Sequence, residues 1–296
     1  MRYKVIHSNA IIIRLGEILK MKTLYVTDLD GTLLNSMDEI SEYSMSVINK
    51  LVDKGMYFTY ATARSLSSAS IASIVSIGLS TKMPVIVYNG AFIIDAGSGE
   101  ILYSINFDNS EKQFIINLLA QYDIYPLVYA YIYGKEKVSW YINKENDGFR
   151  RYLSLRQGDK RLNPLSAQDY LYMGDVFYFT CIGSKEDLLP IYNALDGNEH
   201  YNCILQQELY REEYWCEIMP KKATKANAIQ QLKELWQCDK VISFGDAKND
   251  IPMFAISDEC YAVENAVPKL KSLATGIIDS NEKDGVAKWL HQHYIA

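Results

Sequence analysis

The chain has 296 residues, of which 49% are hydrophobic and 22% are charged. This length and composition are typical of a globular protein with one large or two ordinary domains, and they exclude a mostly disordered chain. The 36 acidic residues outnumber the 30 basic ones and give a formal net charge of -6. Because a surface held on nucleic acid or on anionic lipid is basic, we expect neither nucleic acid nor a membrane as a partner.

The first twenty residues and the cysteines bear on where the protein works. The apolar run at 10–13 is far shorter than the roughly 20 residues of a membrane helix, and no small-x-small cleavage site follows it. We treat residues 1–20 as an N-terminal extension and expect Met21 to be the natural start; the alternative is an ordinary frayed or docked extension. The five cysteines include no CxxC pair, so they predict free thiols in a reducing cytoplasm rather than disulfides or a zinc site.

Strand-like and helix-like segments alternate from Met21 onward. Strands are expected at residues 24–27, 57–62 and 84–88, and helices at residues 41–54 and 66–77. In the first helix Met45, Ile48 and Val52 follow the helical spacing, and Gly55 ends it. This order predicts a parallel sheet with right-handed crossovers and with functional sites at the carboxyl ends of its strands.

Residues 91–214 have a different pattern and contain 15 of the 23 tyrosines. Two short apolar runs, at 91–93 and 101–105, flank the turn-rich residues 95–100 and predict a hairpin. Further strands are expected at residues 125–133, 138–142, 176–182, 202–206 and 214–219, with helices at 109–122, 149–156 and 185–194. We interpret residues 91–214 as an α+β domain inserted into the first domain.

The alternation of strands and helices resumes after Pro220. Helices are expected at 224–236, 251–256 and 285–293, with a short helix after Pro268, and strands at 241–245 and 260–263. The predicted fold class is α/β: a doubly wound, Rossmann-like parallel sheet formed by residues 21–90 and 215–296, with the inserted α+β domain at 91–214.

Asp28 and Asp30 carry the strongest local signal for chemistry. They lie in the sequence DLDGTL at 28–33, directly after the first strand, and Gly31 allows a sharp turn there. Two carboxylates one residue apart at a strand end suit a nucleophile and its proton-transfer partner. A lone DxD in a loop is more often a solvated turn, but the strand before it and the helical pattern after it argue against that interpretation.

A second acidic cluster, GDAKND at 245–250, also follows an apolar strand directly. Asp and Asn oxygens suit a hard cation such as Mg²⁺, although glycine-aspartate clusters also form ordinary turns. In a doubly wound sheet both strand ends face one crevice, so we expect Asp246 and Asp250 to meet Asp28 and Asp30.

Thr62 and Lys225 fit the same crevice. Thr62 ends the second strand and offers a hydroxyl beside backbone N–H groups, which is how phosphate oxygens are commonly held. Lys225 lies near the start of a helix, where its charge would offset the repulsion between the carboxylates and an anionic substrate. Each residue alone is a weak signal, since a threonine at a strand end usually caps a helix and a lysine is usually solvated.

In combination these motifs resemble the haloacid dehalogenase superfamily, specifically its Cof-type phosphatases. The motifs that match in order are DLDGTLL at 28–34, ATAR at 61–64, residues 220–225 and GDAKND at 245–250, with further family elements at 89–91, 262–266 and 284–287. Ala63 and Ala226 stand where the family usually has Gly. Both are changes of one methyl group, and we expect them to preserve the chemistry.

The resemblance implies a reaction through an aspartyl-phosphate. Asp28 would attack phosphorus, and Asp30 would protonate the leaving group and then activate water. Mg²⁺ would bind the Asp28 carboxylate, the Asp30 backbone carbonyl and Asp246. Thr62 and Lys225 would hold the phosphoryl oxygens.

The resemblance also implies residues that surround the phosphate. Asn249 would contact it, and Asp250 would orient Lys225 or a metal-bound water. The other residues expected around the phosphate are Gly31, Ala63, Arg64 and Asn89.

The insertion lies between Thr62 and Lys225, as in Cof-type enzymes, where such a domain caps the active site, excludes water and selects the substrate. It contains a basic cluster flanked by tyrosines, formed by Arg150, Arg151, Arg156, Lys160 and Arg161. Arg150 and Arg151 are candidate contacts for the substrate, although a solvated helix face is the simpler interpretation.

The leading hypothesis is a cytoplasmic, Mg²⁺-dependent phosphomonoesterase acting on small phosphorylated metabolites, either sugar phosphates or phosphorylated cofactors. Two alternatives stay open: a phosphomutase or phosphotransferase on the same core, and a catalytically silent metabolite-binding regulator. The intact Asp28 argues against the regulator, because a binding protein needs no nucleophile. We expect a monomer or a weak homo-oligomer.

Overall fold

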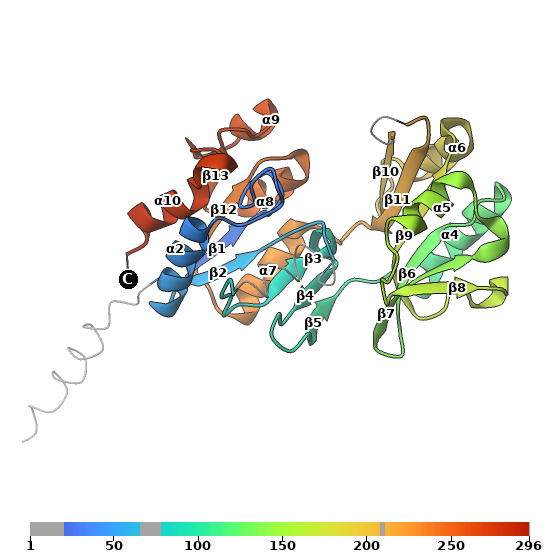
Figure 1. Ribbon diagram of the computed structural model, residues 1–296, viewed down its shortest axis with the longest axis horizontal. Helices are drawn as coiled ribbons and strands as arrows, with labels where there is room; N and C mark the ends of the chain where they lie inside the picture. Colours follow the sequence, from blue (N-terminus) through green and yellow to red (C-terminus); the bar gives the residue numbers. More distant parts are fainter. Residues whose placement is uncertain (1–20, 66–77, 208–210, 296) are drawn as a thin grey trace, which may run out of the picture. The chain divides into compact units, whose positions relative to one another are not determined.

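The computed structural model of the chain describes residues 21–65, 78–207 and 211–295 (Figure 1). The expected N-terminal extension at 1–20 and the expected helix at 66–77 lie outside the described residues. The chain divides into two compact units, which we call the core unit and the inserted unit. The core unit comprises the described residues of Met1–Val87, Ile94–Glu100 and Ala228–Ala296, and the inserted unit those of Tyr88–Ile93 and Ile101–Asn227.

A five-stranded parallel sheet in the order β14-β13-β12-β1-β2 forms the centre of the core unit. Its strands are β1 (Thr23–Thr27), β2 (Tyr57–Tyr60), β12 (Lys240–Gly245), β13 (Glu259–Val263) and β14 (Gly276–Ile278). β1 pairs in parallel with both β12 and β2, so the strand order reverses at β1. In doubly wound sheets the ligand site lies outside the carboxyl ends of the strands at such a reversal.

Most apolar residues of β1, β2, β12 and β13 are buried, as expected for a parallel sheet covered on both faces, whereas Ile277 of the edge strand β14 is exposed. Leu24 and Val26 of β1 and Phe244 of β12 are fully buried. Beyond β2, a parallel bridge joins Ala61 to Ile86 in β3 (Val85–Val87). The helices of the core unit are α2 (Glu42–Asp53), α8 (Ile251–Ile256), α9 (Pro268–Lys271) and α10 (Gly285–His293), and α7 (Lys225–Leu235) starts in the inserted unit and continues in the core unit.

The inserted unit contains a six-stranded sheet in the order β10-β11-β9-β6-β7-β8. Its strands are β6 (Leu127–Ile132), β7 (Lys135–Tyr141), β8 (Leu162–Leu165), β9 (Asp175–Gly183), β10 (Tyr201–Gln207) and β11 (Tyr214–Pro220). All neighbours pair antiparallel except β7 and β8, which are parallel.

Two helices of the inserted unit share a hydrophobic core with its sheet. Ile115 of α4 (Asn109–Gln121) and Ile191 of α6 (Lys185–Leu195) belong to one buried cluster with Val128, Phe179 and Ile218 of the strands. A third helix, α5, spans Asp147–Ser154. The described residues also form short 3₁₀ turns in both units. Those of the inserted unit are η1 (Tyr88–Gly90), η2 (Ile142–Lys144) and η3 (Gln168–Tyr170), and those of the core unit are η4 (Lys248–Asp250) and η5 (Asn281–Lys283).

A three-stranded sheet, β3-β4-β5, includes β4 (Phe92–Ile94) and β5 (Ile101–Ser104), which form the hairpin expected from the sequence. The predicted fold class, a doubly wound parallel sheet with an inserted α+β fold, is confirmed. The sequence pattern does not predict β8 and β14. Among the described residues, no helix is both long and apolar enough to span a membrane, and all five cysteines are free thiols.

Candidate active site

Asp28 occupies the end of β1, where the chain turns away from the sheet. Its backbone N–H donates to the Phe244 carbonyl at 2.9 Å, which fixes the end of β1 beside β12. The residue is only 5% exposed. The following turn is closed by Leu33 N–H, which donates to the Leu29 carbonyl at 3.0 Å, and Gly31 in this turn has φ 72°. The sharp turn predicted after Asp28 is therefore present.

The turn at Gly31 lies directly against Asp246, which follows β12. A Cβ atom on Gly31 would be only 2.5 Å from Oδ2 of Asp246. The hydroxyl of Thr32 donates to Oδ1 of Asp246 at 3.2 Å, and the side-chain amide of Asn265 donates to the Gly31 carbonyl at 2.7 Å. Glycine at position 31 thus permits the contact between two loops that are distant in sequence.

Asp250 fixes the loop that carries Asp246. It is fully buried, and its Oδ2 accepts hydrogen bonds from the backbone N–H groups of Asp246 at 3.0 Å and Ala247 at 3.1 Å. A Cβ atom on Gly245 would lie 2.8 Å from the same oxygen. The GDAKND sequence therefore folds around the carboxylate of its last residue.

Asp28, Asp246 and Asp250 form one group of carboxylates, whereas the Asp30 carboxylate, which we also expected there, is not part of this group. Each offers one ligand atom, and these atoms all lie within 4.8 Å of one another. Carboxylates at this spacing repel one another, and burial of Asp28 and Asp250 reduces screening by water. Carboxylate oxygens are the donors that Mg²⁺ prefers, so the donor set fits that cation.

Asp30 faces Arg64, which lies beyond the end of β2. Nε of Arg64 donates to Oδ2 of Asp30 at 3.0 Å, and Nη2 contacts the other oxygen of the same carboxylate. Nη2 also pairs with Asp38 at 2.8 Å. The bond to Asp30 raises the pKa of Arg64 above its ordinary value. Asp30 is 42% exposed in its side chain, so it is both oriented and open to water.

The loop after β2 places Thr62 and Ala63. Thr62 is fully buried, and its N–H donates to the Ile86 carbonyl at 2.9 Å. Its hydroxyl oxygen accepts from the N–H of Arg64 at 3.1 Å. Ala63 is exposed, as is Asn249 in the loop after β12.

Asn89 and Lys225 lie in the inserted unit. Asn89 is in η1 with φ 53°. Lys225 is the first residue of α7 and is 2% exposed, an unusual environment for a lysine. The sequence already predicts Lys225 near the start of a helix, and its burial there adds an independent sign of function.

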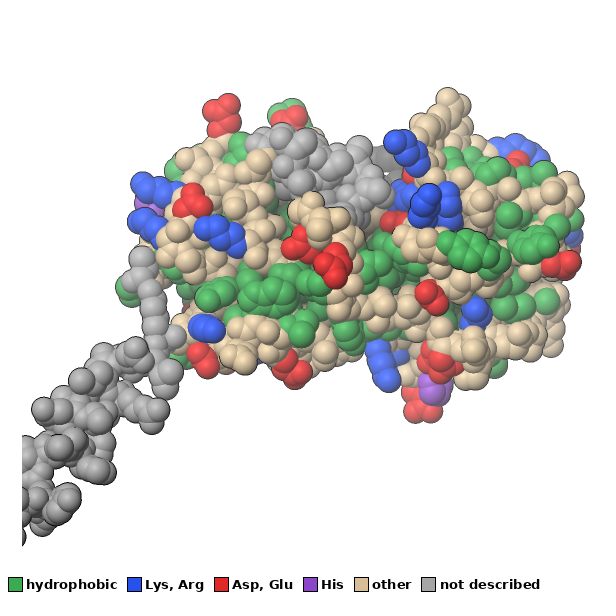
Figure 2. All heavy atoms as spheres, turned by 90° about the horizontal axis from the view of Figure 1, so that it is seen from below, with side chains coloured by type: hydrophobic (Ala, Val, Ile, Leu, Met, Phe, Trp, Pro, Cys, Tyr) green, Lys and Arg blue, Asp and Glu red, His purple; other side chains and the backbone are tan. Residues whose placement is uncertain are grey.

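The four arginines of the basic cluster in the inserted unit contact acidic or aromatic groups. Arg150 pairs with Asp147 at 2.6 Å, and Arg151 pairs with Glu213. The guanidinium of Arg156 lies 3.7 Å from the ring centre of Tyr152. Arg161 pairs with Glu136 and Asp159, both at 2.7 Å. Acidic and basic side chains are likewise interspersed on the face drawn in Figure 2.

Sequence reasoning missed three residues of this site. Thr32 and Asn265 belong to the motifs at 28–34 and 262–266. The motifs therefore point to these positions, but they do not predict the hydrogen bonds that the two side chains make. Asp38 carries no motif signal, because its contact with Arg64 depends on how the loop after Asp30 folds back.

The fold is a doubly wound α/β fold, with a group of carboxylates that follow β1 and β12, the strands beside the reversal of the strand order. Residues 25–290 match the family of haloacid dehalogenase-like hydrolases, and the chain belongs to that family. With the phosphatases found among its relatives, it is a haloacid dehalogenase-type phosphatase.

Two similar relatives come from Bacillus subtilis and are both 5-amino-6-(5-phospho-D-ribitylamino)uracil phosphatases. YwtE is 25% identical, and the match covers 90% of this chain and 96% of YwtE. YitU is also 25% identical, over 92% of this chain and 97% of YitU. Among solved structures, TM0651 of Thermotoga maritima superimposes with a TM-score of 0.74 at 25% identity, covering 93% of this chain and 98% of that one.

Proposed function

We propose that the protein is a Mg²⁺-dependent phosphomonoesterase that hydrolyses small phosphorylated metabolites in the cytoplasm. The observation that carries the proposal is the group formed by Asp28, Asp246 and Asp250, whose ligand atoms lie within 4.8 Å of one another. A nucleophile, its cation ligands and a neighbouring acid at one sheet edge are the equipment that phosphoryl transfer requires.

Asp28 and Asp30 divide the chemistry between them. A carboxylate oxygen of Asp28 attacks phosphorus, the bond from phosphorus to the ester oxygen breaks, and Asp30 gives its proton to that oxygen. Asp30 then takes a proton from water, which attacks the aspartyl-phosphate and releases inorganic phosphate. The side chain of Asp30 is 42% exposed, so water can reach its carboxylate, which supports its part in the second step.

Asp28, Asp246 and the backbone carbonyl of Asp30 are the proposed ligands of Mg²⁺, and the position of Asp250 in the same group supports the site. When bound, the cation offsets the repulsion between the nucleophile and the phosphate dianion. The hydrogen bond from Thr32 and the close approach of Gly31 keep Asp246 in place for this purpose.

Lys225 and Thr62 are the proposed ligands of the phosphoryl oxygens. Lys225 is 2% exposed at the first residue of α7, an uncommon environment for a lysine, and this supports a role in binding an anion. The exposed Asn249 is proposed to contact the phosphate, together with Asn89 and the backbone at Ala63.

The proposed substrates are phosphorylated polyols, sugars and ring-bearing cofactors. The two Bacillus subtilis relatives are named for a phosphate ester of a ribityl chain attached to a uracil ring, which combines a polyol with a heteroaromatic ring. Arg150 and Arg151 stay proposed contacts for the part of the substrate beyond the phosphate.

Phosphate release from a panel of esters tests the proposal. The panel contains the ribitylaminouracil phosphate, sugar phosphates, pyridoxal phosphate, flavin mononucleotide and p-nitrophenyl phosphate. We expect Asp28→Asn to retain less than a few per cent of the wild-type kcat while staying folded, because an amide cannot supply the attacking oxyanion. Asp53→Asn, at an exposed position of the core unit, is the matched control and should keep full activity.

Metal dependence is read in the same assay. Excess chelator should stop hydrolysis, and added Mg²⁺ should restore it. Full activity in chelator would contradict the metal site, and substantial turnover by Asp28→Asn would remove Asp28 from the nucleophile role. Transfer of the phosphoryl group to a second hydroxyl, without release of phosphate, would instead indicate a phosphotransferase.

A further inference from the structure

Three consecutive residues at the start of the inserted unit have positive backbone φ angles. The values are 51° for Tyr88, 53° for Asn89 and 99° for Gly90. Glycine adopts this region freely, but a bulky tyrosine there is strained, and such a residue persists only where its surroundings hold it. The contacts of Tyr88 and Gly90, at the two ends of this segment, show what holds it in the strained conformation.

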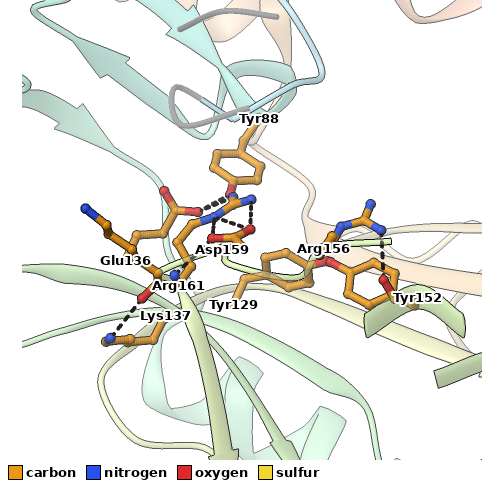
Figure 3. A network of polar contacts seen from close by, with 9 residues as sticks. Tyr88, Tyr129, Glu136, Lys137, Tyr152, Arg156, Asp159 and Arg161 are labelled. Carbon is orange, nitrogen blue, oxygen red and sulfur yellow. Dashed lines mark hydrogen bonds and ion pairs between the residues drawn. The ribbon is translucent and has the colours of Figure 1, made fainter. Parts of the chain in front are cut away.

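Tyr88 is held through its side chain (Figure 3). Its hydroxyl donates a hydrogen bond to Glu136 and accepts one of 2.9 Å from Nη1 of Arg161. Arg161 is fixed in turn by Glu136 and by Asp159, each at 2.7 Å. Burial, and then the charge of Glu136, raise the pKa of Tyr88 well above its usual range, so the hydroxyl keeps its proton and remains a donor. The Tyr88 ring also packs edge-on against Phe177, with 4.9 Å between ring centres.

Gly90, at the other end of the segment, lies against the start of α7. A Cβ atom on Gly90 would be 2.1 Å from the Thr224 carbonyl oxygen and 2.8 Å from the backbone nitrogen of Lys225. The Thr224 hydroxyl accepts a hydrogen bond from the N–H of Asn227 at 3.1 Å, so this contact is made at the fixed first turn of the helix. Because Lys225 is 2% exposed, its side chain has little room to compensate for a shift of its backbone.

We propose that Tyr88 is a positioning residue for Lys225: its hydroxyl, bound between Glu136 and Arg161, holds residues 88–90 in the strained conformation that seats Gly90 against Thr224. All of these residues belong to the inserted unit. The inference rests on the proposed function, because it takes the phosphoryl group as the ligand of Lys225. Loss of the Tyr88 hydroxyl would relax the segment and move the ammonium group away from its ligand.

A double-mutant cycle between Tyr88 and Lys225 tests the proposal. The affinity for inorganic phosphate in the presence of Mg²⁺ is measured by calorimetry, and kcat/KM for p-nitrophenyl phosphate is measured in parallel. We expect Tyr88→Phe to weaken phosphate binding and lower kcat/KM roughly tenfold, since small misplacements of a catalytic group have effects of this order. In the Lys225→Ala background the same change should have less than about a twofold effect, because the group being positioned is gone.

Tyr129→Phe is the matched control. Tyr129 is also buried in the inserted unit, and its hydroxyl shares a hydrogen bond of 2.6 Å with that of Tyr152 (Figure 3). The substitution removes the hydroxyl oxygen from a second buried tyrosine of the same unit. It should leave the phosphate affinity and kcat/KM unchanged. Arg161→Lys keeps a positive charge beside Glu136 but cannot reproduce all contacts of the guanidinium, so it should weaken binding in the same direction as Tyr88→Phe.

The outcomes separate the positioning role from the proposed function. Equal losses from Tyr88→Phe in both backgrounds, no loss in either, or the same loss from Tyr129→Phe would overturn the positioning role. An unchanged phosphate affinity in Lys225→Ala would overturn it as well, because Lys225 would then not bind the phosphoryl group. A folded wild type that hydrolyses none of the esters would contradict the proposed function itself. If Tyr88→Phe fails to fold, the cycle of Arg161→Lys with Lys225→Ala decides by the same criteria.

Discussion

The surroundings of Glu217 and Glu259 shift the pKa values of the two carboxyl groups in opposite directions. Burial of Glu217 in β11 raises its pKa above 4.5, and the hydrogen bond from Tyr178 lowers it only in part. The bond from Lys240, and then that from Tyr261 at 2.6 Å, lower the pKa of Glu259 below 4.5. The first glutamate is therefore held closer to its neutral form in the folded protein, and the second is held more firmly in its charged form.

These directions predict opposite effects of removing each charge. The folded protein keeps the proton of Glu217 where the unfolded chain has lost it, so stability falls as pH rises through 4.5 towards the folded pKa, and the cost remains above it. Glu217→Gln should therefore melt at a higher temperature than the wild type near neutral pH. The advantage should disappear on acidification below the unfolded value.

Glu259→Gln is the comparison with the opposite sign. Glu259 stabilises the fold above its unfolded pKa of 4.5, and this contribution is lost as pH falls through the lower folded value. The variant should melt below the wild type near neutral pH, and the gap should close in acid. Melting curves of the three proteins across this pH range measure both effects, and a lowered Tm of Glu217→Gln at neutral pH would contradict the assignment.

Single residues also mark how far the sequence predicts the site. The meeting of Asp28, Asp246 and Asp250 could be anticipated, because strand-end positions follow from the alternation of strands and helices. The contact of Arg64 with Asp30 could not, because it depends on side-chain conformation and on the path of two loops. The contact of Tyr88 with Arg161 joins residues with no periodic relation and depends on the same kind of detail.

At the scale of elements, the turn after β1 is the most sensitive feature of the site. Gly31→Ala would place a methyl group 2.5 Å from Oδ2 of Asp246, at φ 72°, where side chains are disfavoured. We expect kcat/KM for p-nitrophenyl phosphate to fall at least roughly tenfold, and more Mg²⁺ to be needed for half-maximal activity, because Asp246 must move.

Gly55→Ala separates backbone strain from this contact. Gly55 also has a positive φ, of 98°, but a Cβ atom there would meet nothing within 4 Å. This variant should lose about 1 kcal/mol of stability and keep the wild-type Mg²⁺ dependence. If Gly31→Ala required no more Mg²⁺ than Gly55→Ala, the contact with Asp246 would not matter for the metal.

The two strands that the sequence does not predict are both edge strands. β8 contains Pro164, which normally argues against a strand, but it pairs only with β7 and lies at the edge of its sheet, where a proline is tolerated. β14 has three residues, begins with Gly276 and pairs only with β13. Whether such a short edge strand forms depends on the strand beside it. The central strands, in contrast, can be predicted from their own apolar runs.

At the scale of the whole molecule, Arg150 and Arg151 lie in a different unit from the carboxylate group, so we expect their replacement to change substrate choice more than the reaction of the carboxylates. Combined replacement of Arg150 and Arg151 by Ala should lower kcat/KM several-fold for the best natural substrate, with much less effect on p-nitrophenyl phosphate. In the structure Arg150 pairs with Asp147, and Arg151 pairs with Glu213.

The measurement compares kcat/KM for the two substrates in the wild type and the variant. Lys112→Ala in α4 is the control, at a partly buried cation of the same unit. Equal losses on both substrates would assign the arginines to folding. If kcat/KM falls for neither substrate, the two arginines belong to a solvated surface that does not contact the substrate.

The bounds of the inserted unit have a consequence for exchanging it between related enzymes. A graft cut at 214/215 would sever β11, the strand that pairs with both β9 and β10. A graft covering residues 88–227 would transfer that sheet whole, but it would also bring the donor's residues at the positions of Asn89 and Lys225. Recombination at these joints therefore passes on Lys225, the proposed phosphate ligand, together with Arg150 and Arg151, the proposed substrate contacts, and a chimera inherits all three from the same parent.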